Sequence, residues 1–131
     1  MIAVISKLIA AILGLIRKGE YRQASESIDR IYFDFLREDS SFFHAIPEEE
    51  LTRKLLQEHN YTNGHLEILA ELFNAEAELE LAQGNRNRSL DFSRKSLILF
   101  DFIDKEQKTF SLERADKMTE IRKRIEILKM P

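Results

Sequence analysis

Apolar residues recur at helical spacing through most of the chain, and the pattern is strongest between residues 68 and 103. The first arm of this stretch places apolar residues three and four positions apart, with acidic residues on the opposite side, as in an amphipathic helix. Gly84 follows that arm and can take the left-handed conformation that ends many helices. The second arm carries Ser89, Ser93 and Ser96 at positions where a closely crossing helix requires small side chains. The pattern predicts a hairpin of two helices over residues 66–104.

Similar stripes predict four more helices, which makes six in all. They cover residues 2–19, 21–36, 47–58 and 112–129. The first two form a second hairpin over residues 2–37. Pro47 suits the first turn of the third helix, and the three glutamates after it favour the positive end of the helix dipole. Residues 37–46 have turn character, and we expect their two phenylalanines to fold onto the core.

The last predicted helix is expected to cover the open end of the hairpin at 66–104, as terminal helices do in repeat proteins. Ser111 precedes it and is of a type that commonly caps a helix N-terminus. The apolar seam of this helix consists of Met118, Ile121, Ile125 and Leu128. Acids and bases four residues apart predict ion pairs along the helix. These pairs are Glu113 with Lys117, and Glu120 with Arg124.

The first segment is amphipathic rather than uniformly apolar. Its apolar residues cover half of a helical wheel, while Ser6, Lys7 and Arg17 lie on the other half. A secretory signal peptide has no reason to keep such a polar side, and the run is shorter than the roughly 20 apolar residues that span a bilayer. The stripe is wider than one neighbouring helix can bury, which predicts a homodimer. The residues expected at that contact are Ile2, Ile5, Ile9, Leu13 and Ile16. Peripheral binding to a membrane through the same stripe is the alternative.

Small residues near both predicted turns resemble the tetratricopeptide repeat. The first hairpin has Gly19, Tyr21 and Ala24 in the family's Gly-x-Tyr-x-x-Ala arrangement. The second has Ala77, Gly84, Ser89, Ser96 and Leu97 at the family's turn and helix-crossing positions. Arg86 stands where the family prefers tyrosine. The two glycines are 65 residues apart, about twice the family's 34-residue period.

The whole chain also resembles a group of bacterial proteins of this length that have tetratricopeptide-like helices and no known activity. The shared parts are the apolar first helix, the Gly-x-Tyr-x-x-Ala turn, the Ile-Pro-Glu-Glu-Glu-Leu segment and the hairpin that ends at Gly84. The resemblance implies a fold, an array of α-hairpins or a right-handed superhelical bundle, but it implies no activity.

Composition agrees with one all-α domain over residues 1–131. The chain is 44% hydrophobic, enough for a single core, and has only two prolines and four glycines. It contains no cysteine, so it has neither disulfides nor a thiol nucleophile, which is compatible with a cytoplasmic location.

Charge is unevenly distributed along the chain, although the net charge is only −3. Residues 47–80 hold nine acids and two bases, whereas residues 81–131 hold twelve bases and eight acids. A basic strip for nucleic acid would need the cations of the second part to lie together. They are Arg86, Arg88, Arg94, Lys95, Arg122, Lys123 and Arg124. Because few aromatic residues accompany them and the middle of the chain is acidic, nucleic-acid binding is the weaker alternative.

Residues that could carry catalysis do not form a recognisable set. None of the three histidines, His44, His59 and His65, has the spacing that places two metal ligands on one helical face. Two pairs of glutamates share a helical face, Glu67 with Glu71 and Glu76 with Glu80. We interpret them as a solvated face or as one that meets the basic C-terminal half. No nucleophile motif or phosphate-binding loop is present.

The sequence therefore predicts a non-enzymatic module that binds a protein partner or a second copy of itself. It predicts no cofactor, no metal and no small-molecule substrate.

Overall fold

The computed structural model describes the backbone of residues 2–108 and 110–130, and the side chains of these residues from residue 4 onward. Every regular element in those ranges is helical, as the sequence predicts. The long helices are α1 (Ile2–Arg17), α2 (Tyr21–Ile31), α5 (Asn63–Ala82), α6 (Arg86–Gln107) and α7 (Leu112–Lys129). Shorter elements between α2 and α5 are the π-helical turn η1 (Tyr32–Leu36), α3 (Ser40–His44), the 3-10 turn η2 (Glu48–Glu50), α4 (Leu51–Arg53) and the π-helical turn η3 (Lys54–Glu58).

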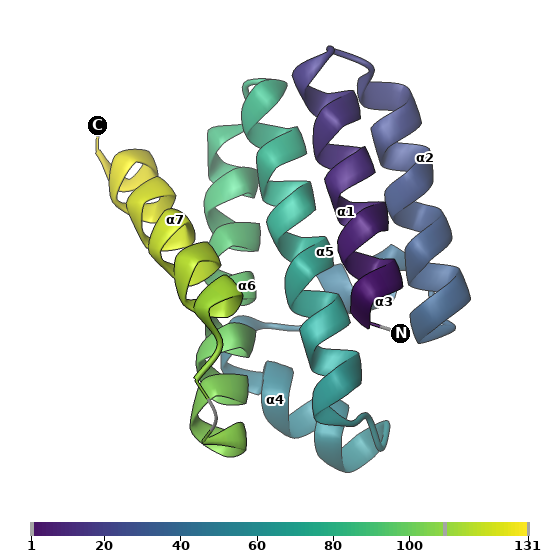
Figure 1. Cartoon of the computed structure of the whole chain (residues 1–131), viewed down its shortest axis with the longest axis vertical. Helices are drawn as coiled ribbons and strands as arrows, with labels where there is room; N and C mark the ends of the chain where they lie inside the picture. Colours follow the sequence, from purple (N-terminus) through teal and green to yellow (C-terminus); the bar gives the residue numbers. More distant parts are fainter. Residues whose placement is uncertain (1, 109, 131) are drawn as a thin grey trace.

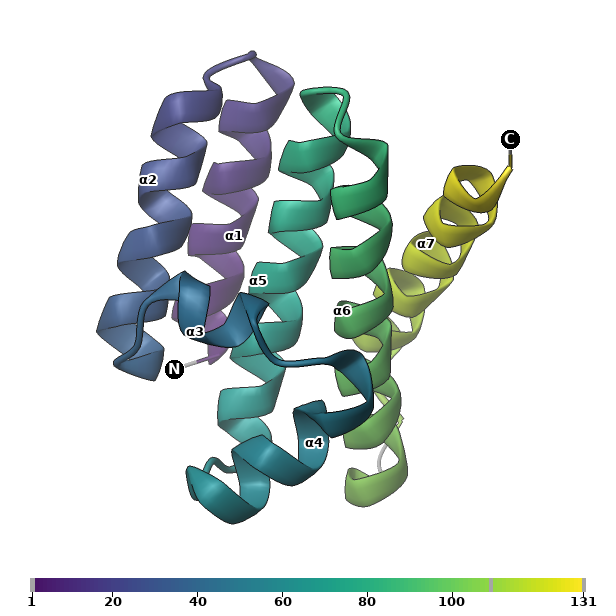
Figure 2. The same ribbon diagram turned by 180° about the vertical axis from the view of Figure 1, so that it is seen from behind.

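Two antiparallel hairpins, α1 with α2 and α5 with α6, lie side by side (Figure 1). Helix α5 is central, because it contacts α1 and α2 on one side and α6 on the other. Helix α7 crosses α6 at an angle at the far end (Figure 1). The short elements lie on the face of the molecule that is turned to the viewer in Figure 2, where α4 packs against α6. The buried side chains of both hairpins and α7 form one continuous core.

Both long hairpins turn in the same way, at the glycines that the sequence singles out. Gly19 and Gly84 have φ of +81° and +84°, a conformation that side chains with a Cβ rarely adopt. After each glycine the next amide donates back across the last helical turn, from Glu20 to the Leu15 carbonyl at 2.9 Å and from Asn85 to the Glu80 carbonyl at 2.8 Å. This is the Schellman ending, which satisfies carbonyl groups that the helix leaves free.

Helices α5 and α6 cross closely because small side chains meet at their contact. The Ser89 hydroxyl donates to the Ala77 carbonyl and the Ser96 hydroxyl to the Ala70 carbonyl, both at 2.7 Å. All four residues are fully buried. The packing role predicted for the serines is therefore confirmed for Ser89 and Ser96.

The connection between the hairpins is more helical than predicted. The sequence predicts a turn at 37–46, whereas Ser40–His44 form α3, so the described residues contain seven α-helices rather than six. A short helix pairs the backbone there while it buries Phe43 completely. The predicted helix at 47–58 is helical from Glu48, but it changes from 3-10 to α to π geometry along its length.

The second hairpin begins earlier than its apolar stripe indicates. Helix α5 starts at Asn63 because Thr62 and His65 form a capping box: the Thr62 hydroxyl accepts from the His65 amide at 3.3 Å, and His65 Nδ1 accepts from the Thr62 amide at 3.1 Å. Histidine replaces the usual Glu or Gln of this motif, which hides it in the sequence. The last helix begins and ends as predicted, with the Ser111 hydroxyl accepting from the Arg114 amide at 3.2 Å.

Candidate functional site

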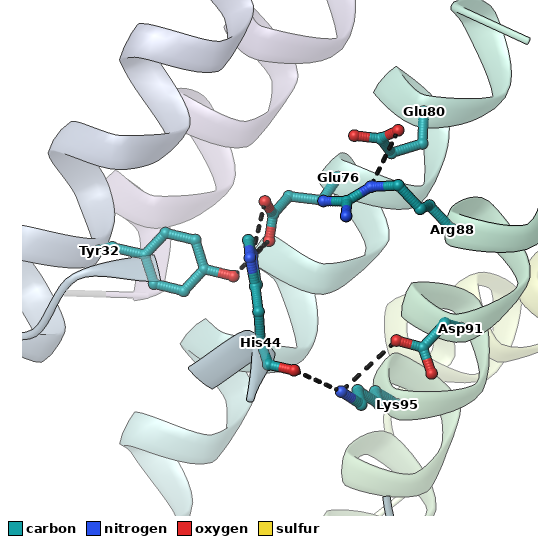
Figure 3. Close-up of polar contacts among 7 residues, drawn as sticks. All are labelled: Tyr32, His44, Glu76, Glu80, Arg88, Asp91 and Lys95. Atoms are coloured by element: carbon teal, nitrogen blue, oxygen red, sulfur yellow. Dashed lines mark hydrogen bonds and ion pairs between the residues drawn. The ribbon is translucent and has the colours of Figure 1, made fainter. Parts of the chain in front are cut away.

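One group of polar side chains lies where the connection crosses α5 and α6 (Figure 3). Glu76 of α5 is its centre. The Tyr32 hydroxyl donates to Glu76 Oε2, and His44 Nε2 lies 2.9 Å from both carboxylate oxygens. We call Tyr32, His44 and Glu76 the buried polar cluster. Its members come from η1, α3 and α5, so it joins three separate elements.

Local structure aims Tyr32 at this carboxylate. Tyr32 is the first residue of η1, and it stacks on Phe43 with ring centroids 5.4 Å apart. Its ring and hydroxyl are completely buried. Burial and the negative charge of Glu76 raise the pKa of Tyr32 well above its ordinary value of 10. The hydroxyl is therefore a fixed hydrogen-bond donor at neutral pH.

Lys95 of α6 fixes the end of α3 from the other side. Its Nζ donates to the His44 carbonyl at 3.0 Å and lies 3.5 Å from Asp91 Oδ2 (Figure 3). The side chain is only 5% exposed, so these two oxygens replace the water contacts that its ammonium group loses. A cation at the C-terminal end of α3 is also favoured by the helix dipole. Lys95 and the buried polar cluster together clamp α3 to the α5–α6 hairpin.

A shallow hollow of about 210 Å³ opens beside this clamp, lined by His44, Asn87, Arg88, Asp91 and Phe92. Arg88 Nε lies 3.3 Å from Glu80 Oε2, and its guanidinium stands 5.5 Å from the centre of the Phe92 ring. A carboxylate against an imidazole is also a way to orient a general base. The hydrogen bonds of Glu76 and His44, however, join one helix to another. Within the described part of the chain, no three His, Asp or Glu side chains are grouped so that they could hold a metal ion.

The opposite side of α5 meets α7 through a second set of charges. Lys117 Nζ donates to Glu71 Oε2, and Arg114 Nε donates to Asp104 Oδ1 at 2.6 Å and reaches within 3.8 Å of Glu67 through Nη1. The predicted meeting of an acidic face with the basic C-terminal half is therefore confirmed for Glu67 and Glu71. Burial raises the pKa of Glu71, although Lys117 opposes the shift.

Arg124 of α7 makes polar contacts with both α5 and α6 in this second group. Its guanidinium donates to Ser93 Oγ at 2.8 Å, to Asn74 Oδ1 at 2.6 Å and to Glu78 Oε1. Burial lowers its pKa, and the Glu78 carboxylate opposes that shift. Lys117 and Arg124 bond across to α5 rather than to Glu113 and Glu120 along α7, although the negative charge of Glu120 still favours the charged form of Arg124.

The basic residues considered for nucleic acid do not form one exposed strip. Lys95 and Arg124 are buried, and both are held by groups of the chain itself. Arg88 is paired with Glu80. Two of the seven cations are therefore engaged inside the chain, whereas Arg86, Arg94, Arg122 and Lys123 are exposed.

The N-terminal stripe predicted for self-association lies inside the chain. Ile5, Ile9 and Ile16 are buried in the core and Leu13 is partly buried, so the expected role of these residues at a dimer contact is wrong. The side chain of Ile2 lies outside the described residues. The predicted stripe is buried because α1 packs against both α2 and α5, two neighbours rather than one. The same burial removes the stripe from any membrane surface.

The residues of the repeat pattern take structural positions. Gly19 and Gly84 form the turns, Ala24 and Ala77 are fully buried, and Tyr21 is partly buried at the start of α2. Sequence reasoning did not identify Tyr32, His44 or Lys95 as a group. Tyr32 and Glu76 are 44 positions apart, and no spacing rule connects residues that only the folded connection brings together.

Comparison with known proteins adds no assignment. The chain matches no protein-family model, and neither a curated protein nor a solved structure is found to be similar to it. No helix among the described residues has both the length and the apolar content needed to cross a bilayer.

Proposed function

We propose that the chain is a non-enzymatic helical module that binds a protein, and that its first partner is a second copy of itself. The contact we propose is the outer side of the α1–α2 hairpin. On α1, apolar residues stand one position before each buried isoleucine and form a second stripe. This outer stripe consists of Val4, Leu8, Ala11 and Leu15.

The main support for this proposal is that the outer stripe borders a hollow in the surface. Leu8, Ala11 and Leu15 line, with Ile31 of α2 and Phe35 of η1, a hollow of about 140 Å³ between the two helices. Val4 and Leu8 are 53% and 37% exposed. Apolar residues that gather around a hollow at the surface are typical of protein contacts, whereas single exposed apolar residues are ordinary.

Charged residues at the rim of this hollow favour a second copy of the chain as the partner. Arg30 and Asp34 of the α2–η1 helix border the hollow one turn apart. If two copies meet with these helices antiparallel, a two-fold axis midway between the two positions brings Arg30 of each copy against Asp34 of the other. A two-fold contact repeats each favourable pair, so the arrangement is self-complementary.

The polar groups elsewhere support a module without catalysis. The buried polar cluster and the α5–α7 charges are engaged in contacts between helices. The α5 helix lies against both helices of the preceding hairpin, as successive repeats do in solenoids, which supports the tetratricopeptide-like array as part of this proposal.

Light scattering of the purified chain at tens of micromolar tests self-association. We expect a dimer, and we expect Leu8→Glu to convert it to a monomer because a carboxylate would be buried in an apolar contact. The matched control is Ile127→Glu on α7, where the side chain is similarly apolar and 58% exposed. This control should remain a dimer.

Charge reversal tests the register of the contact. Arg30→Asp should weaken the dimer by placing like charges together, and the double variant Arg30→Asp/Asp34→Arg should restore it. A wild-type monomer at this concentration would contradict the self-association proposal. Loss of the dimer in Ile127→Glu but not in Leu8→Glu would move the contact to α7.

A further inference from the structure

A small cavity lies where α1, α5 and α7 meet, and one carboxylate oxygen in its wall has no partner in the protein. The cavity has a volume of about 30 Å³. Glu71 of α5 is only 6% exposed, and its Oε1 is buried without a hydrogen bond. The other oxygen, Oε2, accepts from Lys117. Leaving a buried acceptor unpaired is unfavourable, which points to a donor at this position.

The polar lining of the cavity is rich in acceptors. Besides Glu71, the residues that line it include Ser6, Ser111, Glu67 and Glu113. Ser111 Oγ already accepts from the Arg114 amide, so its own proton can be donated. The two cations in the wall are already engaged, Lys117 with Glu71 and Arg114 with Asp104. An additional particle that brings its own protons can therefore supply the hydrogen bond that Glu71 Oε1 lacks.

Size limits what can occupy the cavity. A water molecule needs roughly 10 to 15 Å³ of such space, together with two to four polar partners, so one particle of that size fits. A multivalent metal is not favoured, since no three metal-ligating side chains of the described residues are grouped for one.

We propose that this cavity binds one water-sized hydrogen-bond donor, which donates to Glu71 Oε1 and bridges it to the hydroxyls of Ser6 and Ser111. The donor ties the N-terminal helix and the start of α7 to α5. Water and the ammonium ion share this chemistry and fit the space, and the experiment distinguishes them.

A high-resolution crystal structure of the full chain is the first test. We expect one density peak within hydrogen-bonding distance of Glu71 Oε1. In Glu71→Gln the amide oxygen can still accept and the peak should persist, whereas Glu71→Met removes the acceptor and should lose it. Ser6→Ala is the second variant, should Glu71→Met fail to fold; it should weaken the peak.

Two solution measurements complete the test. Water should give a cross-relaxation signal to amides near Glu71 in nuclear magnetic resonance, and the melting temperature should be equal in sodium chloride and ammonium chloride. A rise in melting temperature specific to ammonium, and absent in Glu71→Met, would identify ammonium as the donor. An unoccupied cavity overturns the proposal, as does a proton on the Glu71 carboxyl with no second molecule beside it.

Discussion

Helix α5 carries buried glutamates on two sides, and the two sides differ in how many donors reach them. Glu76 and Glu71 are 9% and 6% exposed. The carboxylate of Glu76 receives Tyr32 and His44, which together engage both oxygens. The carboxylate of Glu71 receives Lys117 on one oxygen only. The structural role of a buried carboxylate therefore depends on how many hydrogen-bond donors reach it, and not on residue type and burial alone.

The difference separates two structural roles. On the Glu76 side the partners come from the connection between the hairpins, so the carboxylate fixes η1 and α3 in place. On the Glu71 side the partner comes from the terminal helix, and burial raises the pKa of Glu71. We expect substitutions on the Glu76 side to act on stability and, through Tyr32, on its dependence on alkaline pH, and those on the Glu71 side to act on its dependence on pH above 4.5.

Removing the carboxylate of Glu76 should have the largest effect. Glu76→Ala leaves the buried Tyr32 hydroxyl and the partly buried His44 Nε2 without their acceptor, and it should lower the free energy of unfolding by about 3 kcal/mol. Urea denaturation followed by circular dichroism measures it. Glu26→Ala is the control, because Glu26 forms only an exposed i,i+4 pair with Arg22. Equal costs for the two variants would show that the cluster does not hold the connection.

Removing the cation that pairs with Glu71 should have the next largest effect. Lys117→Met keeps the length of the side chain but leaves a buried carboxylate without a cation, and it should cost about 2 kcal/mol at neutral pH. The same denaturation experiment applies. Lys105→Met is the matched control, since Lys105 pairs with Asp101 at an exposed position. A loss no larger than that of the control would mean that Lys117 contributes nothing to holding α7.

Tyr32→Phe should lower the free energy of unfolding by about 1 kcal/mol, because it removes one hydrogen bond and keeps the ring. The folded pKa of Tyr32 is raised, so the stabilisation from its retained proton is present below pH 10 and is lost as the pH rises through the folded pKa. The wild type should lose stability above pH 10 more steeply than the variant. Parallel alkaline losses in both proteins would contradict this assignment.

Glu71→Gln should have the smallest effect at neutral pH, below about 1 kcal/mol, because it exchanges an ion pair for a group that is less costly to bury. The folded pKa of Glu71 is raised above its ordinary 4.5, so stabilisation from its proton is present below that pH and is lost as the pH rises through the folded pKa. The stability of the variant relative to the wild type should therefore increase over that range. Urea midpoints measured across it give the comparison, and a constant difference would argue against the raised pKa.

Local sequence by itself determined much of the fold. Apolar spacing set the long helices, Gly19 and Gly84 set the two turns, and Ser111 set the start of α7. Ser89 and Ser96 marked the close crossing of α5 and α6. The helices, turns and cap depend on residues within a few positions of one another, and backbone sterics, capping and helical periodicity act at that range. The crossing joins residues 12 and 26 positions apart, but the small serines at helical spacing still indicate it.

Only the tertiary structure decided which apolar stripe of α1 is buried and whether Lys117 pairs along α7 or across to α5. It alone brought Tyr32 and His44 to Glu76, over separations of 44 and 32 positions. Such choices depend on which helices become neighbours, because a side chain selects its partner from everything within reach after folding. The spacing of residues along one helix contains no information about that neighbour.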